Sequence, residues 1–193
     1  MRKRILLAVS CTLCMTVCFG QPAWKFRSDN YAGLAAGELG SYGHVQTVNG
    51  LYKGPWFLGL GTALDYYRFR SIPLFLSMTR DLPAFSKRSG LFVHLDGGVD
   101  LPWYKRPFVP YEWVTSSFHS GSYYSAGLGY KWSLSDHTGK ALLLSASYSM
   151  KKMSEDQTSP SSCSNPGSCY MLTQTNVYEY MNRIFLFAVG FRF

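Results

Sequence analysis

Three side chains suited to acid–base or ion-binding chemistry lie at even-numbered intervals in one segment of the chain. His94, Asp96 and Asp100 are separated by two and four residues. Residues two apart point to the same face of a β-strand, whereas a helix would spread these groups around its axis. The alternate positions are mostly apolar: Leu91, Val93, Leu95, Gly97, Val99, Leu101 and Trp103. The sequence therefore predicts a strand with one polar and one apolar face.

Other charged residues lie on the less apolar face of further alternating segments, at Asp65, Lys131 and Arg192. These groups could line a path for ions or solutes, or His94 and Asp96 could activate Ser125 as a nucleophile. They could also pair with one another inside a narrow barrel, because eight strands enclose barely more than their own side chains. We favour this structural interpretation and assign no catalytic residue. The sequence has no phosphate loop, CxxC pair or HExxH motif, and we expect neither a metal nor a cofactor.

A second chemical feature is the cysteine pair Cys163 and Cys169, which flanks the turn-forming run Asn165-Pro166-Gly167. Two cysteines around a turn in an exported chain predict a disulfide. A metal site would need two more ligands, and no His or further Cys lies nearby.

Export is predicted from the first 20 residues. Arg2-Lys3-Arg4 is followed by a mostly apolar run over 5–19, which is too short to span a bilayer comfortably. Small residues favour cleavage before Gln21. The alternative is a lipoprotein signal acylated at Cys11 or Cys18, but the first follows too short an apolar run and the second follows a larger residue than such sites prefer. We therefore predict a signal peptide over 1–20 and a single domain over 21–193.

Composition excludes one class of partner. Removing the signal leaves 16 Lys and Arg against 11 Asp and Glu, a net charge of about +5 with no basic run. Nucleic acid is therefore not an expected partner. No later stretch has 18 consecutive apolar residues, so no transmembrane helix is expected. Alternating strands can still cross a membrane, since their apolar face is hidden by the alternation.

Alternation recurs along the chain, over 56–67, 72–79, 123–132, 142–150 and 184–193. The region from Asn30 to Leu51 alternates less clearly and can supply strands over 31–37 and 43–49. With the strand from Leu91 this makes eight strands, an even number as in bacterial barrels. The last strand places Phe187, Val189, Phe191 and Phe193 on one face. Such a face would promote aggregation in water but suits lipid.

Connector lengths suggest how the barrel is oriented. If the C-terminus is periplasmic, the connectors 49–54, 82–89 and 135–140 are periplasmic turns, and 38–42, 69–71, 104–120 and 154–176 are external loops. The two longest connectors then share the outer side, as expected. Aromatic residues near strand ends predict interfacial girdles: Trp56, Trp103, Tyr104, Trp132, Tyr178 and Tyr180. Trp113, in a long loop, is our best single candidate for an external contact.

The chain resembles small outer-membrane β-barrel proteins of Gram-negative bacteria, the porin-family or outer-membrane-protein β-barrel domain. The resemblance rests on the signal ending before Gln21, the alternating strands, the run from Asp65 to Leu74 and the terminal Phe191-Arg192-Phe193. The hairpin sequence Tyr66-Tyr67-Arg68-Phe69-Arg70-Ser71-Ile72-Pro73 is similar to members from the Bacteroidota. The resemblance implies that the barrel-assembly machinery recognises Phe187, Val189, Phe191 and Phe193.

We therefore predict an all-β protein, an eight-stranded antiparallel up-and-down transmembrane β-barrel in the bacterial outer membrane. The expected partners are outer-membrane lipid, the assembly machinery and an external ligand at the long loops, and we expect a monomer. The predicted role is structural or surface interaction rather than catalysis. The alternatives are a narrow channel or small-ligand transporter, a lipid-modifying outer-membrane enzyme, and a secreted lipocalin-like barrel with its apolar faces turned inward.

Overall fold

The computed structural model describes residues 24–67, 70–83, 86, 88–103, 115–134, 139–160 and 173–193. These residues form nine strands: β1 (Lys25–Gly37), β2 (Gly40–Lys53), β3 (Trp56–Asp65), β4 (Ser71–Asp81), β5 (Ser89–Pro102), β6 (Thr115–His119), β7 (Gly121–Ser133), β8 (Ala141–Pro160) and β9 (Thr173–Arg192). Among the described residues, no helix is long and apolar enough to cross a membrane.

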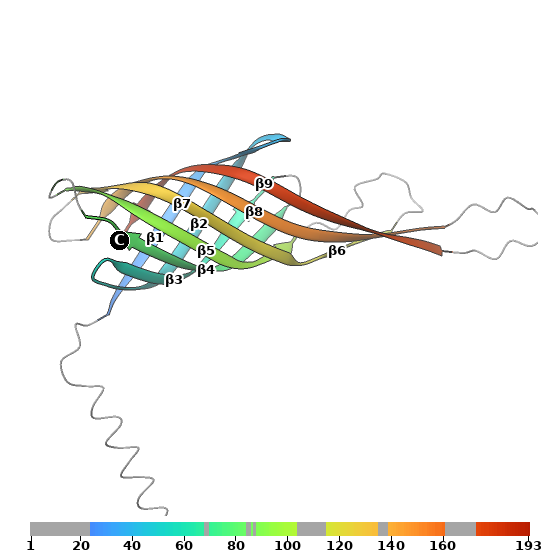
Figure 1. The fold of residues 1–193 in the computed structure, drawn as a ribbon, viewed down its shortest axis with the longest axis horizontal. Coiled ribbons are helices and arrows are strands. Elements are labelled where there is room, and N and C mark those ends of the chain that lie inside the picture. The colour runs from blue at the N-terminus through green and yellow to red at the C-terminus, as the bar shows by residue number, and fades with distance from the viewer. Residues whose placement is uncertain are drawn as a thin grey trace, which may run out of the picture.

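Eight of these strands close into an antiparallel barrel (Figure 1). Each pairs with the next along the chain, in the order β1-β2-β3-β4-β5-β7-β8-β9, and β9 returns to pair with β1. The closing ladder runs from Asp29↔Arg192 to Gly37↔Ile184. The predicted fold class is therefore confirmed. Closure leaves no free sheet edge within the barrel wall, which a membrane-spanning sheet requires.

The ninth strand, β6, continues the edge of β7 along β8. The last β7 pair is Tyr123↔Lys151 and the nearest β6 pair is His119↔Ser154. Between these pairs the chain advances four residues on one strand and three on the other, so a bulge around Ser120 separates β6 from β7. Bulges of this kind are common at barrel rims, where they increase the local twist.

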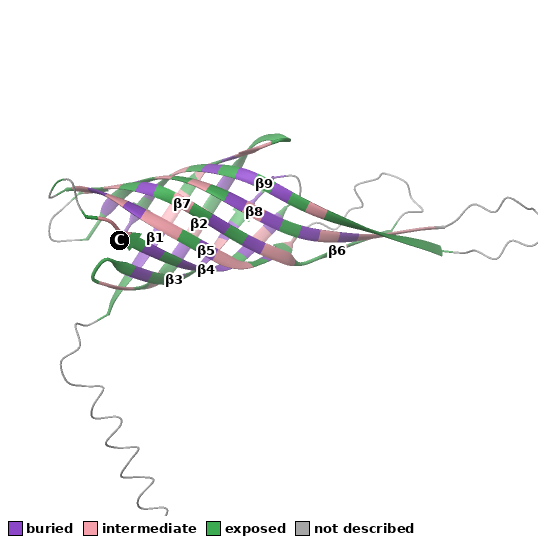
Figure 2. Ribbon diagram, viewed as in Figure 1, coloured by how far each residue is buried: buried purple, intermediate pink, exposed green. Residues whose placement is uncertain are grey.

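The apolar face of the strands points away from the barrel axis, and Figure 2 shows the alternation as bands along the strands. On β3, Trp56, Leu58 and Leu60 are exposed, whereas the intervening Phe57 is buried. On β9, the exposed fractions of Phe187, Val189 and Phe193 are 57%, 58% and 56%. A lipocalin-like barrel would bury these faces, so that alternative is wrong.

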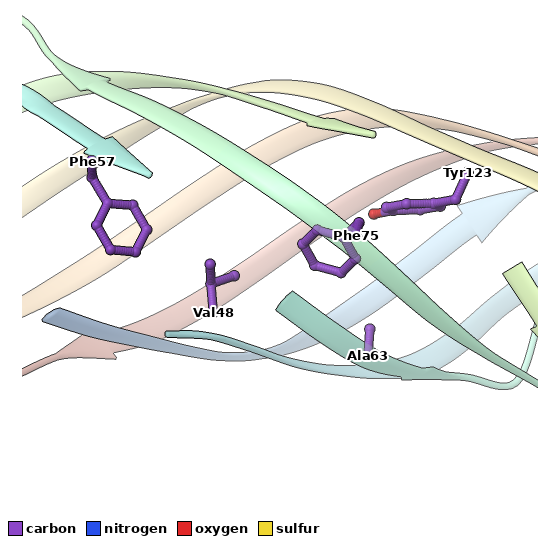
Figure 3. Close-up of a cluster of buried hydrophobic side chains, with 5 residues drawn as sticks. All are labelled: Val48, Phe57, Ala63, Phe75 and Tyr123. Atoms are coloured by element: carbon purple, nitrogen blue, oxygen red, sulfur yellow. The ribbon is translucent and has the colours of Figure 1, made fainter. Parts of the chain in front are cut away.

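The barrel interior is filled by aromatic rings that pack over glycines. Phe75 lies opposite Gly61, and Phe92 opposite Gly129. A Cβ atom at either glycine would overlap the facing ring, so the small residue makes room for the large one. Figure 3 shows one interior cluster, made by Val48, Phe57, Ala63, Phe75 and Tyr123. The interior is therefore a packed core.

The short turns and the C-terminus lie at one end, here called the C-terminal rim. The turn after β2 contains Gly54, whose φ of 60° favours glycine. The connectors after β4 and β7 occupy 82–88 and 134–140, close to the predicted turns. Strands β1, β3, β5 and β8 end at the opposite rim. The predicted division of connectors between two ends agrees with this arrangement.

Several predicted strand bounds were too short. β1 begins at Lys25 and β2 covers Gly40–Lys53, so the connectors predicted over 38–42 and 49–54 are largely strand. β8 continues to Pro160 and β9 begins at Thr173, well inside the loop predicted over 154–176. These ends are rich in polar residues on both faces, which hides the alternation. Backbone pairing between β8 and β9 nevertheless continues through them.

Some predictions concern residues outside the described part of the chain. They are the signal peptide over 1–20, the Cys163–Cys169 disulfide, Tyr104 and Trp113. These remain predictions.

Candidate functional site

The structure places the six sequence-predicted polar residues on the inner face of the barrel. Asp65, Asp96, Asp100 and Arg192 are buried, and His94 and Lys131 are partly buried. They do not form one site, because they belong to three separate groups along the barrel axis.

The first group is a five-charge cluster near the C-terminal rim, made by Arg27, Asp29, Asp81, Lys131 and Arg192. Arg192 donates to both carboxylate oxygens of Asp29, at 2.8 and 3.0 Å. Arg27 Nη2 lies 2.7 Å from Asp29 Oδ2, and Lys131 Nζ lies 2.5 Å from Asp81 Oδ2. Arg192 Nη1 joins the two halves at 3.4 Å from Asp81 Oδ1. Four strands, β1, β4, β7 and β9, are thereby linked across the interior.

Aromatic rings close around this cluster. The Arg27 guanidinium lies 4.0 Å from the centre of the Phe57 ring, and that of Arg192 lies 5.5 Å from the Phe92 ring. Both distances allow cation–π attraction. The five-charge cluster thus holds three cations and two anions, and two of the cations pack against aromatic rings.

The second group lies toward the opposite rim and centres on Lys151. Its ammonium is 2.5 Å from Asp65 Oδ2 and 3.9 Å from Asp100 Oδ1. It also lies 5.6 Å from the centre of the Tyr123 ring. The Lys151 side chain is 4% exposed and that of Asp65 only 1%, so the pair is shielded from solvent. This group carries two anions and one cation.

The third group, between the two clusters, contains the residues that could have formed a catalytic triad. His94 Nε2 lies 3.9 Å from Asp96 Oδ2, beyond hydrogen-bond range. Ser125 is paired in register with Asp96, and no hydrogen bond links it to His94 among the described residues. The geometry therefore lacks the ordered Ser–His–Asp arrangement that nucleophilic catalysis uses.

The space beside His94 and Asp96 is small. A cavity lined by these residues, His44, Gln46 and Ser77 has a volume of about 20 Å³. That is room for about one or two water molecules, since one water needs at least roughly 10–15 Å³ on this measure. A lipid, a sugar or a peptide would not fit. The middle of the barrel can hold ordered water but cannot accept a substrate in this conformation.

Four members of the two charged clusters were not predicted from the sequence: Arg27, Asp29, Asp81 and Lys151. The first two precede the predicted start of the first strand at Tyr31. The other two continue inward-facing series, with Asp81 two residues beyond Thr79 and Lys151 two residues beyond Ser149. Each predicted strand would include these residues on its inner face if its alternating pattern were extended by two to four residues.

A sheet formed by β6 and the distal parts of β8 and β9 extends past the opposite rim (Figure 1). We call it the projecting sheet, and it comprises Thr115–His119, Lys152–Pro160 and Thr173–Arg183. The β8–β9 ladder continues from Lys152↔Met181 to Pro160↔Thr173, after pairing with β7 and β1 has ended. At about 3.3 Å per residue, these nine residues of β8 reach roughly 30 Å beyond the barrel.

Side-chain contacts hold the projecting sheet together. His119 Nε2 and Asp156 Oδ2 are 2.9 Å apart across β6 and β8, and the Tyr180 hydroxyl donates to Glu155 Oε2 at 2.8 Å. The second contact corrects the predicted girdle, because Tyr180 lies on the inner face of the sheet and not toward lipid. Trp56, Trp103 and Trp132 are exposed, as a girdle requires.

These features define a small antiparallel barrel with an apolar outer belt and a filled interior. No protein-family model and no curated protein sequence matches the chain. The solved structures that are similar to it include the following two. Neisserial surface protein A (NspA) has 11% sequence identity and a TM-score of 0.54, over 86% of this chain and 94% of that one. The outer membrane protein OprG from Pseudomonas aeruginosa has 9% identity and a TM-score of 0.55, over 90% and 98%.

At these identities the likeness shows the fold alone. The chain has the closed eight-stranded barrel fold of Gram-negative outer-membrane proteins. The porin-family assignment and the likeness to members from the Bacteroidota stay predictions.

Proposed function

We propose that this protein is an exported outer-membrane barrel, closed to solutes, that uses its projecting sheet for contacts outside the cell. The apolar belt and the fold it shares with outer-membrane barrels support the location. The terminal face of Phe187, Val189, Phe191 and Phe193 is exposed and supports a role as the assembly signal. The C-terminal rim is then periplasmic and the projecting sheet external.

The observation that carries this proposal is the contrast between the two ends of β8. Its barrel part faces a filled interior crossed by ion pairs, which favours a structural role for the lumen. Its distal part is built into a three-stranded sheet that the barrel does not need for closure. A hydrogen-bonded sheet of this length is ordered before a partner binds. Binding therefore does not lose the conformational entropy of ordering a flexible loop.

Recognition features are present on this sheet. Val177 and Tyr178 are exposed, on opposite faces of β9. Beside the bulge, a pocket of about 320 Å³ is lined by Ser120, Lys152, Glu179 and Met181, among others. The apolar Met181 is thus flanked by the charged Lys152 and Glu179, and an apolar centre with a polar rim is typical of a surface that contacts another protein.

The test removes the sheet and keeps the barrel. In the trimmed variant, residues 154–179 are replaced by Asn-Gly, which can join Met153 to Tyr180 in a two-residue hairpin. Cells carrying the trimmed variant should lose attachment to one another or to protein-coated surfaces, while heat-modifiable gel mobility shows that the barrel still folds.

A milder pair of variants controls for gross rearrangement. Val177→Ser with Tyr178→Ser should weaken attachment, whereas Leu39→Ser, at the exposed β1–β2 turn on the same rim, should not. Attachment that is unchanged in the trimmed variant would contradict the proposed role.

A further inference from the structure

The outer face of β1–β3 carries a row of polar side chains inside the apolar belt. We call it the membrane-face polar row, and it comprises Asn30, Thr47, Asn49 and Thr62, which lies opposite Thr47 in register. The row adjoins Ser28, whose side chain is buried. Asn49 Nδ2 donates to Thr47 Oγ1 at 3.3 Å, and Thr47 donates to Asn30 Oδ1 at 2.8 Å. Asn30 Nδ2 then donates to Ser28 Oγ at 3.1 Å. This row is also why the sequence from Asn30 to Leu51 alternates weakly.

Apolar residues bracket the row on each strand. Phe26 and Leu34 flank it on β1, Val45 and Leu51 on β2, and Leu60 and Leu64 on β3, all of them exposed. Thr62 lies six residues along β3 from Trp56, which is about 20 Å at 3.3 Å per residue and about 14 Å along the barrel axis at a 45° tilt. An apolar band in this class of barrel is about 25 Å tall, so Thr62 lies well inside it and out of reach of lipid head groups.

The outer faces of β4, β5, β8 and β9 are less polar than those of β1–β3. Between their ends, the outward positions of β4, β5, β8 and β9 are apolar or glycine, for example Leu74, Leu76, Leu95, Val99, Leu144 and Phe187. Polar groups on one sector of a lipid-facing surface are unfavourable in hydrocarbon unless another molecule satisfies them. Within the described residues, the Thr62 hydroxyl makes no hydrogen bond, and Asn49 Oδ1 accepts none.

Part of the row borders a shallow hollow in the outer surface. A groove of about 630 Å³ runs over Asn30, Ala32, Thr47 and Thr62, with Val45 and Leu64 on one side and Val189 and Phe191 on the other. Small residues on its floor allow another backbone to approach closely, which is how polar and small residues join membrane-spanning elements.

We propose that the membrane-face polar row is an interface that binds a second copy of this chain within the membrane. Amide and hydroxyl groups both donate and accept hydrogen bonds, so the row is complementary to itself across a two-fold axis. Acyl chains offer no such partners, and head groups are out of reach at the level that Asn30, Thr47 and Thr62 share in register. The inference departs from the monomer expected from the sequence. It rests on the proposed membrane location but not on the proposed role of the projecting sheet.

Cross-linking of the full mature chain in phosphatidylcholine vesicles tests the contact directly. In a Cys163→Ser, Cys169→Ser background, Asn49→Cys should form a disulfide-linked dimer on mild oxidation. The matched control, Ala126→Cys, lies exposed on β7 across the barrel and should stay at background. Equal cross-linking at both positions would overturn the inference.

Sedimentation in detergent measures the strength of association. Thr47→Val with Asn49→Leu should raise the dimer dissociation constant at least tenfold, whereas the outward control Leu144→Val should leave it unchanged. Wild-type protein that is monomeric at every concentration in both detergent and vesicles would overturn the inference, as would equal association of the double variant.

Folding is followed in parallel by heat-modifiable mobility and vesicle flotation. Protein that floats and folds but stays monomeric contradicts the interface alone. Protein that does not insert into vesicles contradicts the proposed location and the interface together.

Discussion

At the scale of single residues, the charges inside the barrel act as pairs that connect strands across the interior. Lys151 on β8 contacts Asp65 on β3, and Arg192 on β9 contacts both Asp29 on the neighbouring β1 and Asp81 on β4. A buried charge is costly unless it is paired, and removing one partner leaves the other uncompensated. The two lysines differ in burial, because Lys131 and Asp81 are about one-fifth exposed whereas Lys151 and Asp65 are almost fully covered.

This difference predicts unequal effects of the same substitution. Lys151→Met should lower the free energy of unfolding by about 3–5 kcal/mol, because it leaves a buried carboxylate unpaired. Lys131→Met should cost about 1 kcal/mol or less, since water can solvate Asp81. Urea unfolding in vesicles, followed by tryptophan fluorescence, measures both.

The control is the double variant Lys151→Met with Asp65→Leu. It removes both charges and should recover much of the loss, because a well-packed apolar pair can replace a buried ion pair. Equal losses for the two lysine variants would show that burial does not govern these pairs.

At the scale of elements, neighbouring strands fit through small and large residues placed opposite each other. Gly129 on β7 faces Phe92 on β5, whose ring fills the space that a side chain would take. Gly97, on the outer face of the same β5, has only an ordinary contact available at Tyr124. The two glycines lie in adjacent strands, but a side chain would overlap a neighbouring ring only at Gly129.

Replacing each glycine by valine should therefore change the stability of the barrel by different amounts. Gly129→Val should cost about 1–3 kcal/mol of stability, because the added methyl groups displace the Phe92 ring. Gly97→Val should be neutral or slightly stabilising, since a β-branched residue suits an exposed strand position. Urea midpoints of the folded, heat-modifiable band provide the comparison. A larger loss at Gly97 would mean that the faces of β5 are wrongly assigned.

At the scale of the whole molecule, the barrel is blocked by its own side chains. The five-charge cluster occupies one end, the Lys151 group the other, and a cavity of about 20 Å³ lies between them. An ion would have to separate several pairs to pass. The molecule therefore combines a closed barrel with a long projecting sheet.

We expect purified wild-type protein in a planar bilayer to give no steady conductance. The Asp96→Asn and Lys131→Met variants should likewise give no steady current. Neither substitution removes the ion pairs of both the five-charge cluster and the Lys151 group. A steady current in the wild type that responds to either substitution would instead support the channel alternative. Insertion is checked in the same bilayers with a conducting porin added as a positive control.

Much of this architecture could be predicted from the sequence because alternation is a local property. The faces of 56–67, 72–79 and 184–193 follow from side chains at adjacent positions, and the apolar residues on them can be recognised without knowing their neighbours. The same reasoning placed Asp65, His94, Asp96, Asp100, Lys131 and Arg192 on inner faces. It failed where both faces are polar, as in the distal parts of β8 and β9, because there backbone pairing and not burial maintains the strand.

Local alternation in the sequence specifies which side of each clear strand is apolar, and hence predicts a barrel with an apolar exterior. Which charges meet in the interior depends on the three-dimensional arrangement of the strands. Arg192 and Asp29 are 163 positions apart, and they approach because β9 closes on β1. The register between β1 and β2 likewise joined Asn30 to Thr47 in the membrane-face polar row. Such contacts depend on strand register and barrel closure, which are long-range properties that no local pattern encodes.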